Sequence, residues 1–246
     1  MISDIQALAR TVFMEKGYHF IHIPLVDTEI GAYQLKLNGN KYLVINTSKS
    51  LANNNFAVAH ELYHLIIQVD GRGDGEEVYI NTYEDNNDEM MANAFAGIIL
   101  MPGEDFILTA ERIKKNIVNH LKNNEDYIYE IATIIGLMVY YRTTYMAVAI
   151  RCFETRILDY EDDALVTFVL NNNDEDALRG IFDNLGARMG ADSIMRATGE
   201  DDYRFLLDRV EEKKASYIQE GLLTEEDYNY RLAGLNQAYQ QIRRKD

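Results

Sequence analysis

The chain has 246 residues, of which 47% are hydrophobic, and a formal net charge of −16 at pH 7. This length and composition indicate a folded chain with one well-formed core and an appendage, or with two small domains. The acidity argues against direct binding to the phosphate backbone of a nucleic acid. The single cysteine, Cys152, excludes an intramolecular disulfide and a thiolate-ligated structural zinc, and such sparse cysteine usage fits a reducing cytoplasm.

The sequence predicts neither a secretion signal nor a membrane span. Residues 1–4 lead directly into an amphipathic pattern, without the basic and apolar regions of a signal peptide. The longest apolar run, at 92–101, is about half of the roughly 20 residues that a bilayer requires. We therefore expect a cytoplasmic protein with no membrane partner.

The start of the chain predicts a helix followed by a small antiparallel sheet. Residues 2–16 carry apolar side chains at helical spacing. Residues 19–25 alternate between polar and apolar side chains, as in a half-buried strand. Residues 33–37 and 42–46 flank an Asn-Gly-Asn turn at 38–40, which is typical of a β-hairpin.

The next stretch, Asn55–His64, reads NFAVAHELYH and contains the pattern H-E-x-x-H. Residues four apart on a helix lie on the same face, so His60 and His64 can bind one metal ion. Glu61 lies beside the first histidine, where it can accept a proton from a water molecule. The pattern falls within an apolar helix, as a buried active-site helix requires. The alternative is an ordinary helix whose two histidines pair with nearby acids.

Two histidines leave a tetrahedral zinc site short of one protein ligand. Glu89 is the favoured third ligand because it begins an otherwise apolar helix, where a buried charge needs a partner. A carboxylate in the polar loop before that helix is ordinarily a solvated charge. The remaining candidates are Asp70, Glu76, Glu77, Glu84, Asp85 and Asp88, the last being better explained as a helix cap.

The segment from Tyr42 to Pro102 resembles the ImmA/IrrE metallopeptidases, whose genes often accompany repressors of phages and mobile elements. The resemblance rests on YLVIN at 42–46, FAVAHELYH at 56–64 and EMMANAFAGIILMP at 89–102. It extends more weakly to about Ile157.

This resemblance implies a zinc peptidase with one Zn²⁺ per chain. It implies that His60, His64 and Glu89 are the zinc ligands and that Glu61 is the general base of peptide hydrolysis. Asn93, one turn after Glu89, is a candidate for orienting a ligand. Hydrogen bonding at the edge of the core is an equal alternative for Asn93.

A peptide substrate is expected to lie extended and to add to an edge strand of the sheet. Strand 42–46 leads into the metal helix, so Tyr42, Val44 and Asn46 are the predicted substrate contacts. A second group that stabilises the oxyanion is expected, although an ordinary surface or packing role is the simpler explanation for each candidate. These candidates are Tyr79, Tyr83, His120 and Tyr140.

Helices dominate the rest of the chain. After the buried helix at 89–100, a helix or a pair of short helices is predicted over 104–122. Two further short helices, at 127–135 and 140–153, surround a turn at Gly136 and resemble a helix-turn-helix. Helix pairs of this kind are more often packing units than readers of DNA.

We predict an α+β fold: a mainly helical, zincin-like domain with a small antiparallel sheet, followed by a helical C-terminal extension. The metallopeptidase domain spans 1–160 and includes the helix-turn-helix-like pair at about 127–157. An acidic, mostly helical accessory domain spans 161–246, through which self-association is one expectation. Its predicted elements are a strand-like run at 164–170 and helices at 175–189, 202–220 and 225–243.

The leading hypothesis is a zinc endopeptidase that cleaves one specific cytoplasmic protein. The resemblance implies that the substrate is a DNA-binding helix-turn-helix repressor of a phage or mobile element. The alternative is a stress or transcription regulator that uses the same fold mainly for binding, with weak or absent proteolysis.

Overall fold

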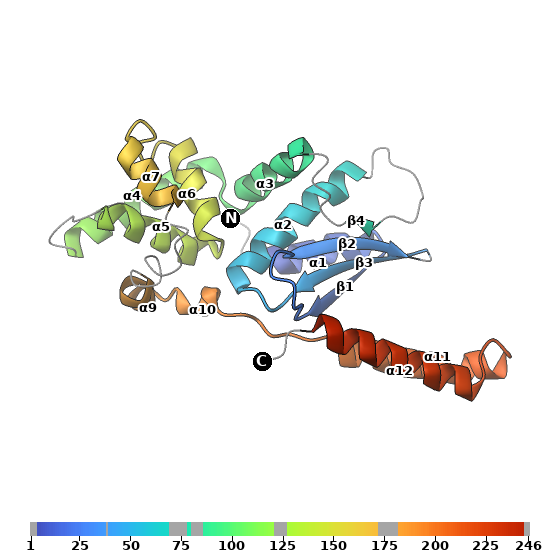
Figure 1. Ribbon diagram of the computed structural model, residues 1–246. Helices are drawn as coiled ribbons and strands as arrows, with labels where there is room; N and C mark the ends of the chain where they lie inside the picture. Colours follow the sequence, from blue (N-terminus) through green and yellow to red (C-terminus); the bar gives the residue numbers. More distant parts are fainter. Residues whose placement is uncertain are drawn as a thin grey trace.

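The computed structural model describes residues 4–37, 39–68, 78–79, 86–120, 127–171 and 182–243. The fold is α+β and mainly helical, as predicted. A small sheet lies under helices α1 and α2, a second group of helices gathers at the opposite end, and α11 and α12 project beneath the sheet (Figure 1).

Helix α1 spans Ile5–Glu15 and confirms the first predicted helix. Its N-cap residue Asp4 accepts a hydrogen bond from the backbone N–H of Ala7 at 3.0 Å, which satisfies one of the unpaired donors at the helix start. The helix buries one side chain on each turn against β1 and α2: Ile5, Ala9 and Phe13.

The sheet contains β1 (Tyr18–Ile23), β2 (Ala32–Leu37), β3 (Asn40–Asn46) and β4 (Val78–Tyr79) in the order β1-β3-β2-β4. The predicted β2–β3 hairpin is confirmed. The sheet is mixed rather than purely antiparallel, because β3 pairs with β1 in parallel. This pairing arises because the hairpin's second strand inserts between β1 and β2.

The prediction that strand 42–46 is an edge strand is wrong. Tyr42 pairs with His19 of β1 on one side and with Leu35 of β2 on the other. A strand that is hydrogen-bonded on both sides cannot add a substrate strand. Tyr42, Val44 and Asn46 are therefore not substrate contacts of that kind.

Asn46 has a structural role instead. Its side chain is fully buried, and its Oδ1 accepts a hydrogen bond from the backbone N–H of Leu25 at 3.0 Å. Its Nδ2 donates to the backbone oxygens of Asp27 and Ile30, each at 2.8 Å. This one amide fixes the loop between β1 and β2.

Helix α2 (Leu51–Gln68) packs on the sheet, and α3 (Asn86–Leu100) packs on α2. Helices α4 (Gly103–His120), α5 (Ile128–Tyr141) and α6 (Tyr145–Glu154) form the opposite end of the molecule. Among the described residues, no single helix is long and apolar enough to span a membrane. Two pairs reach that length only together, and they are bent by 63° and 111°.

The predicted turn at Gly136 is wrong, because Gly136 lies inside α5. A Cβ atom at this position would lie 2.7 Å from Cγ2 of Ile113 on α4. The glycine therefore permits a close approach of two helices rather than a reversal of the chain. The actual turn begins at Arg142, which has a left-handed φ of 53°.

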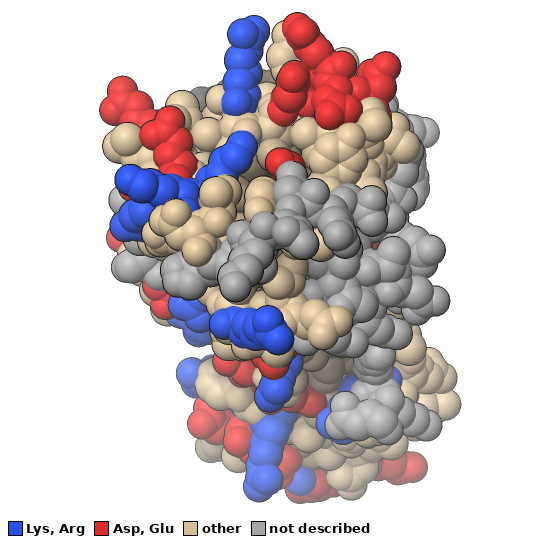
Figure 2. Space-filling view, turned by 90° about the vertical axis from the view of Figure 1, so that its left-hand side faces the viewer, with Lys and Arg blue, Asp and Glu red and all other residues tan. Residues whose placement is uncertain are grey.

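Helices α5 and α6 form the predicted helix-turn-helix-like pair, bent by 111°. Most of α5 is buried in the helical cluster. The one basic residue of α6, Arg151, forms an ion pair with Glu154 at 2.9 Å. Figure 2 shows acidic and basic side chains intermingled on this end of the molecule, so these observations favour a packing role for the pair.

The predicted strand at 164–170 is wrong, because residues Asp163–Asn171 form helix α7. The β-branched residues suggested a strand. However, Oδ1 of Asp162 accepts hydrogen bonds from the N–H groups of Ala164 and Leu165, which starts a helix. Leu165 and Val169, one turn apart, are then both buried.

Short helical elements follow, and then a long helical hairpin. These elements are η1 (Phe182–Gly186), α9 (Ala187–Met189), α10 (Asp192–Met195), α11 (Tyr203–Gln219) and α12 (Glu225–Ile242). The last two confirm the predicted terminal helices, including the capping box formed by Thr224 and Asp227 at the start of α12. The first part of the helix predicted at 175–189 lies outside the described residues.

Residues 196–202, which we call the strap, connect α10 to α11 and run across the main domain. The backbone oxygen of Arg196 accepts a hydrogen bond from the N–H of Leu51 at 3.0 Å. Further along, Gly199 donates its N–H to the backbone oxygen of Thr47 at 3.1 Å. The strap is thereby fastened to the start of α2 and to the end of β3.

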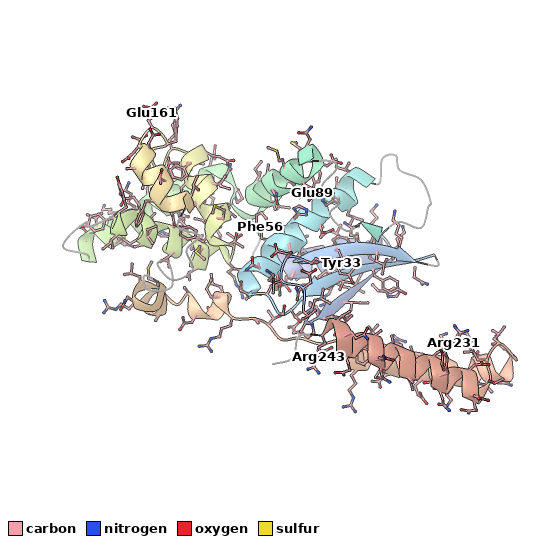
Figure 3. The ribbon with its side chains drawn as sticks, in the orientation of Figure 1. Tyr33, Phe56, Glu89, Glu161, Arg231 and Arg243 are labelled. Atoms are coloured by element: carbon pink, nitrogen blue, oxygen red, sulfur yellow. The ribbon has the colours of Figure 1, made fainter. Side chains whose placement is uncertain are left out.

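The strap ends at the outer edge of β1, beside His22. The backbone N–H of Asp202 donates to the backbone oxygen of His22 at 2.9 Å, and Oδ2 of Asp202 accepts from the His22 N–H at 2.8 Å. Arg243, at the end of α12, returns to the main domain through a bridge with Leu25 (Figure 3). The segment after residue 160 contacts the main domain repeatedly. The division into two domains near residue 160 stays a prediction.

Candidate metal centre

Helix α2 places its two histidines side by side. His60 and His64 lie one turn apart, and their Nε2 atoms are 3.1 Å from each other. His60 is 8% exposed and the adjacent Glu61 is 6% exposed, so both lie in the interior despite their polarity. Buried polar groups require partners, and the neighbouring helix supplies one.

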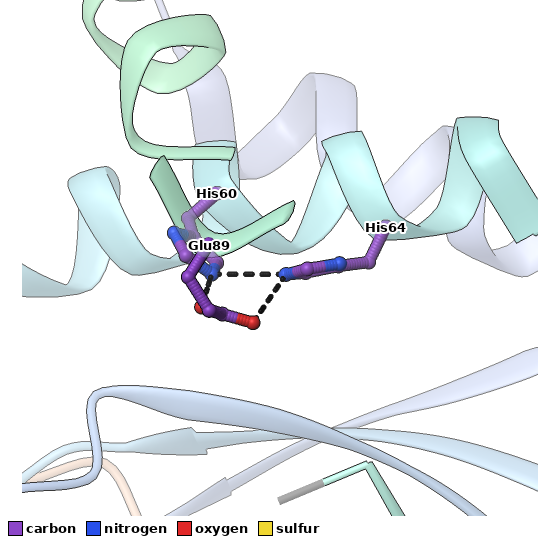
Figure 4. Close-up of side chains that lie close together, drawn as sticks. All are labelled: His60, His64 and Glu89. Carbon is purple, nitrogen blue, oxygen red and sulfur yellow. Dashed lines mark hydrogen bonds and ion pairs between the residues drawn. The ribbon is translucent and has the colours of Figure 1, made fainter. Parts of the chain in front are cut away.

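Helix α3 brings Glu89 to the histidine pair. One carboxylate oxygen, Oε2, lies 3.1 Å from Nε2 of His60, and the other, Oε1, lies 3.4 Å from Nε2 of His64. Figure 4 shows the three side chains facing one another between the two helices and the sheet. Within the described part of the chain, these residues are the group of histidines and acids that could hold a metal ion.

The separations fit a single metal ion. Ligand atoms that bind one zinc ion at about 2.0–2.1 Å with tetrahedral angles lie about 3.3–3.4 Å apart. The two histidine Nε2 atoms are 3.1 Å apart, and each lies 3.1 or 3.4 Å from a different oxygen of the Glu89 carboxylate, so the cluster is close to that spacing. Two imidazoles and one carboxylate are also a donor set found in catalytic zinc sites, which keep the fourth position open.

Asn93 fixes the orientation of one ligand. Its Oδ1 lies 3.0 Å from Nδ1 of His60. An amide oxygen only accepts, so Nδ1 carries the proton and Nε2 keeps its lone pair toward the cluster. Sequence reasoning placed Asn93 next to a ligand, and the structure shows which ligand it contacts.

The electrostatic environment keeps His64 suited to binding a metal. Burial lowers the pKa of His64, and the neighbouring His60 lowers it further, whereas Glu89 and Asp88 oppose this shift. The neutral imidazole is the form that coordinates metals.

Glu61 lies next to the cluster and is held by a residue that sequence reasoning missed. Burial raises the pKa of Glu61 to about 7, a hydrogen bond from Gln34 opposes this shift, and the charge of Glu89 adds to it. Nε2 of Gln34, on β2, donates to the Glu61 side chain at 3.1 Å. The signal in the sequence was a polar residue in the middle of a strand, which by itself is too common to single out.

Two of the other candidates have described side chains. Tyr140 is partly exposed on α5, where Arg112 of α4 stacks on its ring. Asp88 lies in the first turn of α3. The alternative third ligands Asp70, Glu76, Glu77, Glu84 and Asp85, and the side chains of Tyr79, Tyr83 and His120, lie outside the described part of the structure.

The single cysteine is not a candidate nucleophile. Cys152 is fully buried in α6, and this burial raises the pKa of its thiol to about 12. A thiolate is the reactive form of cysteine, so this side chain is inert at neutral pH.

Comparison with known proteins assigns the chain to a family. The family model described as IrrE N-terminal-like domain (Peptidase_M78) matches residues 14–153, which is more than half of the chain. No curated protein matches. The match covers the sheet, both metal-site helices and the helix pair α5–α6. The chain therefore belongs to the ImmA/IrrE family of metallopeptidases.

Proposed function

We propose that the protein is a zinc-dependent endopeptidase that cleaves one specific protein. The observation that carries this proposal is the cluster of His60, His64 and Glu89, whose donor atoms lie within 4.8 Å of one another and could therefore bind one zinc ion. Glu61, the general base, is buried beside that cluster.

A bound zinc ion would supply Lewis-acid activation of the attacking water and of the peptide carbonyl. Glu61 then accepts a proton and later donates it. Its Oε2 already accepts a hydrogen bond from Gln34, so Oε1 is the oxygen that takes the proton from the attacking water. The same oxygen delivers this proton to the amine of the leaving peptide.

The substrate lies extended beside β4, the edge strand that pairs with β2. Gln34 places β2 directly against Glu61, which makes this side the one next to the site. On the opposite side, the backbone of His22 in β1 is already bonded to the strap. Main-chain pairing would hold the substrate, and its side chains would supply selectivity.

We infer the class of substrate from the family. A helix-turn-helix repressor encoded beside the gene of this protein is the first candidate, and cleavage would relieve repression. The acidic character of the chain is consistent with a protein rather than a nucleic acid as its direct partner.

Metal analysis and one substitution test the proposal. Purified protein should contain about one zinc ion per chain. Glu61→Gln keeps the shape of the side chain and the ligands, so the variant should retain zinc but lose cleavage of the repressor. If Glu61→Gln behaves like the wild type in every assay, the protein is instead a binding regulator that uses the peptidase fold.

A further inference from the structure

Gln34 occupies a position where an apolar residue would be expected. Its side chain is 1% exposed, whereas its neighbours on β2, Tyr33 and Leu35, are only half-buried. The alternation of the strand thus directs the amide toward α2. Its Oε1 has no hydrogen-bond partner among the described residues, and a buried amide atom without a partner costs free energy. Stability alone therefore does not explain this residue.

The contacts of Gln34 converge on one residue. Its Nε2 donates to the backbone oxygen of Glu61 at 2.9 Å and to Oε2 of the Glu61 side chain at 3.1 Å. Both partners accept, so the amide cannot be flipped without losing both hydrogen bonds. One NH₂ group therefore donates hydrogen bonds to both the backbone oxygen and the carboxylate of Glu61.

Without these two hydrogen bonds, the Glu61 carboxylate would be free to change rotamer. A glutamate side chain has three rotatable bonds and loses much rotamer freedom when it is held in one position. Glu61 must keep one carboxylate oxygen within hydrogen-bond reach of the water it activates. A misplacement of about 1 Å at a reacting group can lower the rate about 100-fold.

We propose that Gln34 is a positioning residue for peptide cleavage: it holds the Glu61 carboxylate in one rotamer through Oε2 and leaves Oε1 for the proton. This inference rests on the proposed function, in which Glu61 is the general base. The double contact is formed across the interface between the sheet and α2, so the sheet both carries the substrate and orients the base.

A structural experiment tests, without any substrate, whether the hydrogen bonds from Gln34 hold Glu61 in one rotamer. Gln34→Met has a similar volume but no donor, so crystals of the zinc-loaded variant should show Glu61 in more than one rotamer. Zinc content should remain that of the wild type, because Gln34 touches no ligand in the described structure. If Glu61 keeps its wild-type rotamer in Gln34→Met, the proposal is overturned.

A kinetic experiment tests the consequence, with the repressor encoded beside the gene of this protein as the substrate. Gln34→Met should lower kcat about 10–100-fold, the usual effect of losing a supporting contact, and leave KM nearly unchanged. Gln34→Glu should lower kcat further, because its carboxylate would face that of Glu61. An unchanged kcat in both variants would contradict a positioning role.

Asn54 provides the matched control. It is a buried amide on α2 with 1% exposure, its oxygen has no hydrogen-bond partner among the described residues, and its Nδ2 donates to Thr198 of the strap at 3.4 Å rather than to Glu61. Asn54→Leu should change the melting temperature but not kcat. If wild-type protein does not cleave the repressor, the proposed function fails, and the crystal structure of Gln34→Met still decides whether Gln34 holds Glu61.

Discussion

The ring of His60 is held at both of its nitrogens. Nδ1 is bonded to Asn93, while Nε2 points at His64 and Glu89. A metal ligand held in this way loses little orientational freedom on binding, so the partner of its second nitrogen contributes to metal affinity. Asn93 is an exposed residue of α3, and it can therefore be replaced without opening the core.

We expect Asn93→Ala to lower zinc affinity about 10–100-fold, because His60 loses the hydrogen bond that fixes its tautomer. Competition against a fluorescent zinc chelator would measure this change. Asn87→Ala, which removes another exposed amide from α3, is the control and should bind zinc as the wild type does. Equal affinity in both variants would show that Asn93 does not support the ligand.

Among the secondary-structure elements, two helical glycines have opposite surroundings. Gly136 of α5 faces Ile113 at 2.7 Å and Met189 at 3.1 Å from the position of an added Cβ, whereas Gly97 of α3 faces open space within 4 Å. The same substitution should therefore have opposite effects at the two positions.

Gly136→Ala should lower the free energy of unfolding by about 1–3 kcal/mol, because α4 and α5 must move apart. Gly97→Ala should raise it by about 0.5–1 kcal/mol, since alanine loses less backbone entropy in a helix. Chemical denaturation of both variants would measure the difference. A loss of stability at Gly97 as well would mean that helix packing does not cause the effect at Gly136.

Sequence patterns predicted the elements whose signals are local. The capping box at Thr224 and the Asn-Gly-Asn turn at 38–40 correctly marked a helix start and a hairpin. The order of the strands within the sheet was not predictable, because the insertion of β3 between β1 and β2 depends on contacts between distant residues. The burial of Gln34 escaped prediction for the same reason, since it depends on which face of β2 meets α2.

At the scale of the whole molecule, the strap joins the C-terminal helices to β1 near the start of the chain. Asp202 binds both the backbone and the side chain of His22, with Oδ2 of Asp202 3.1 Å from Nδ1 of the ring. These residues are 180 positions apart in the sequence, so no local pattern could have indicated the contact. This contact fastens the start of α11, which buries none of its own residues, while the bridge between Leu25 and Arg243 fastens the end of α12.

Asp202→Ala should lower the free energy of unfolding by about 1.5–3 kcal/mol, the usual range for a hydrogen bond to a charged group, and should loosen the hairpin. Hydrogen exchange of residues 203–243 should become faster, while zinc content stays unchanged. Asp208→Ala, at an exposed position of α11, serves as the control. Unaltered exchange in Asp202→Ala would show that other contacts hold the tail.

The strap at β1 has a further consequence, for solubility. An uncovered strand edge is a template on which strands of other chains can assemble, and natural proteins commonly cover such edges. Asp202 occupies the backbone groups of His22 on the outer side of β1. The C-terminal segment thus covers part of the β1 edge of the sheet, whereas β4 forms the opposite edge, beyond the strand that contacts Glu61.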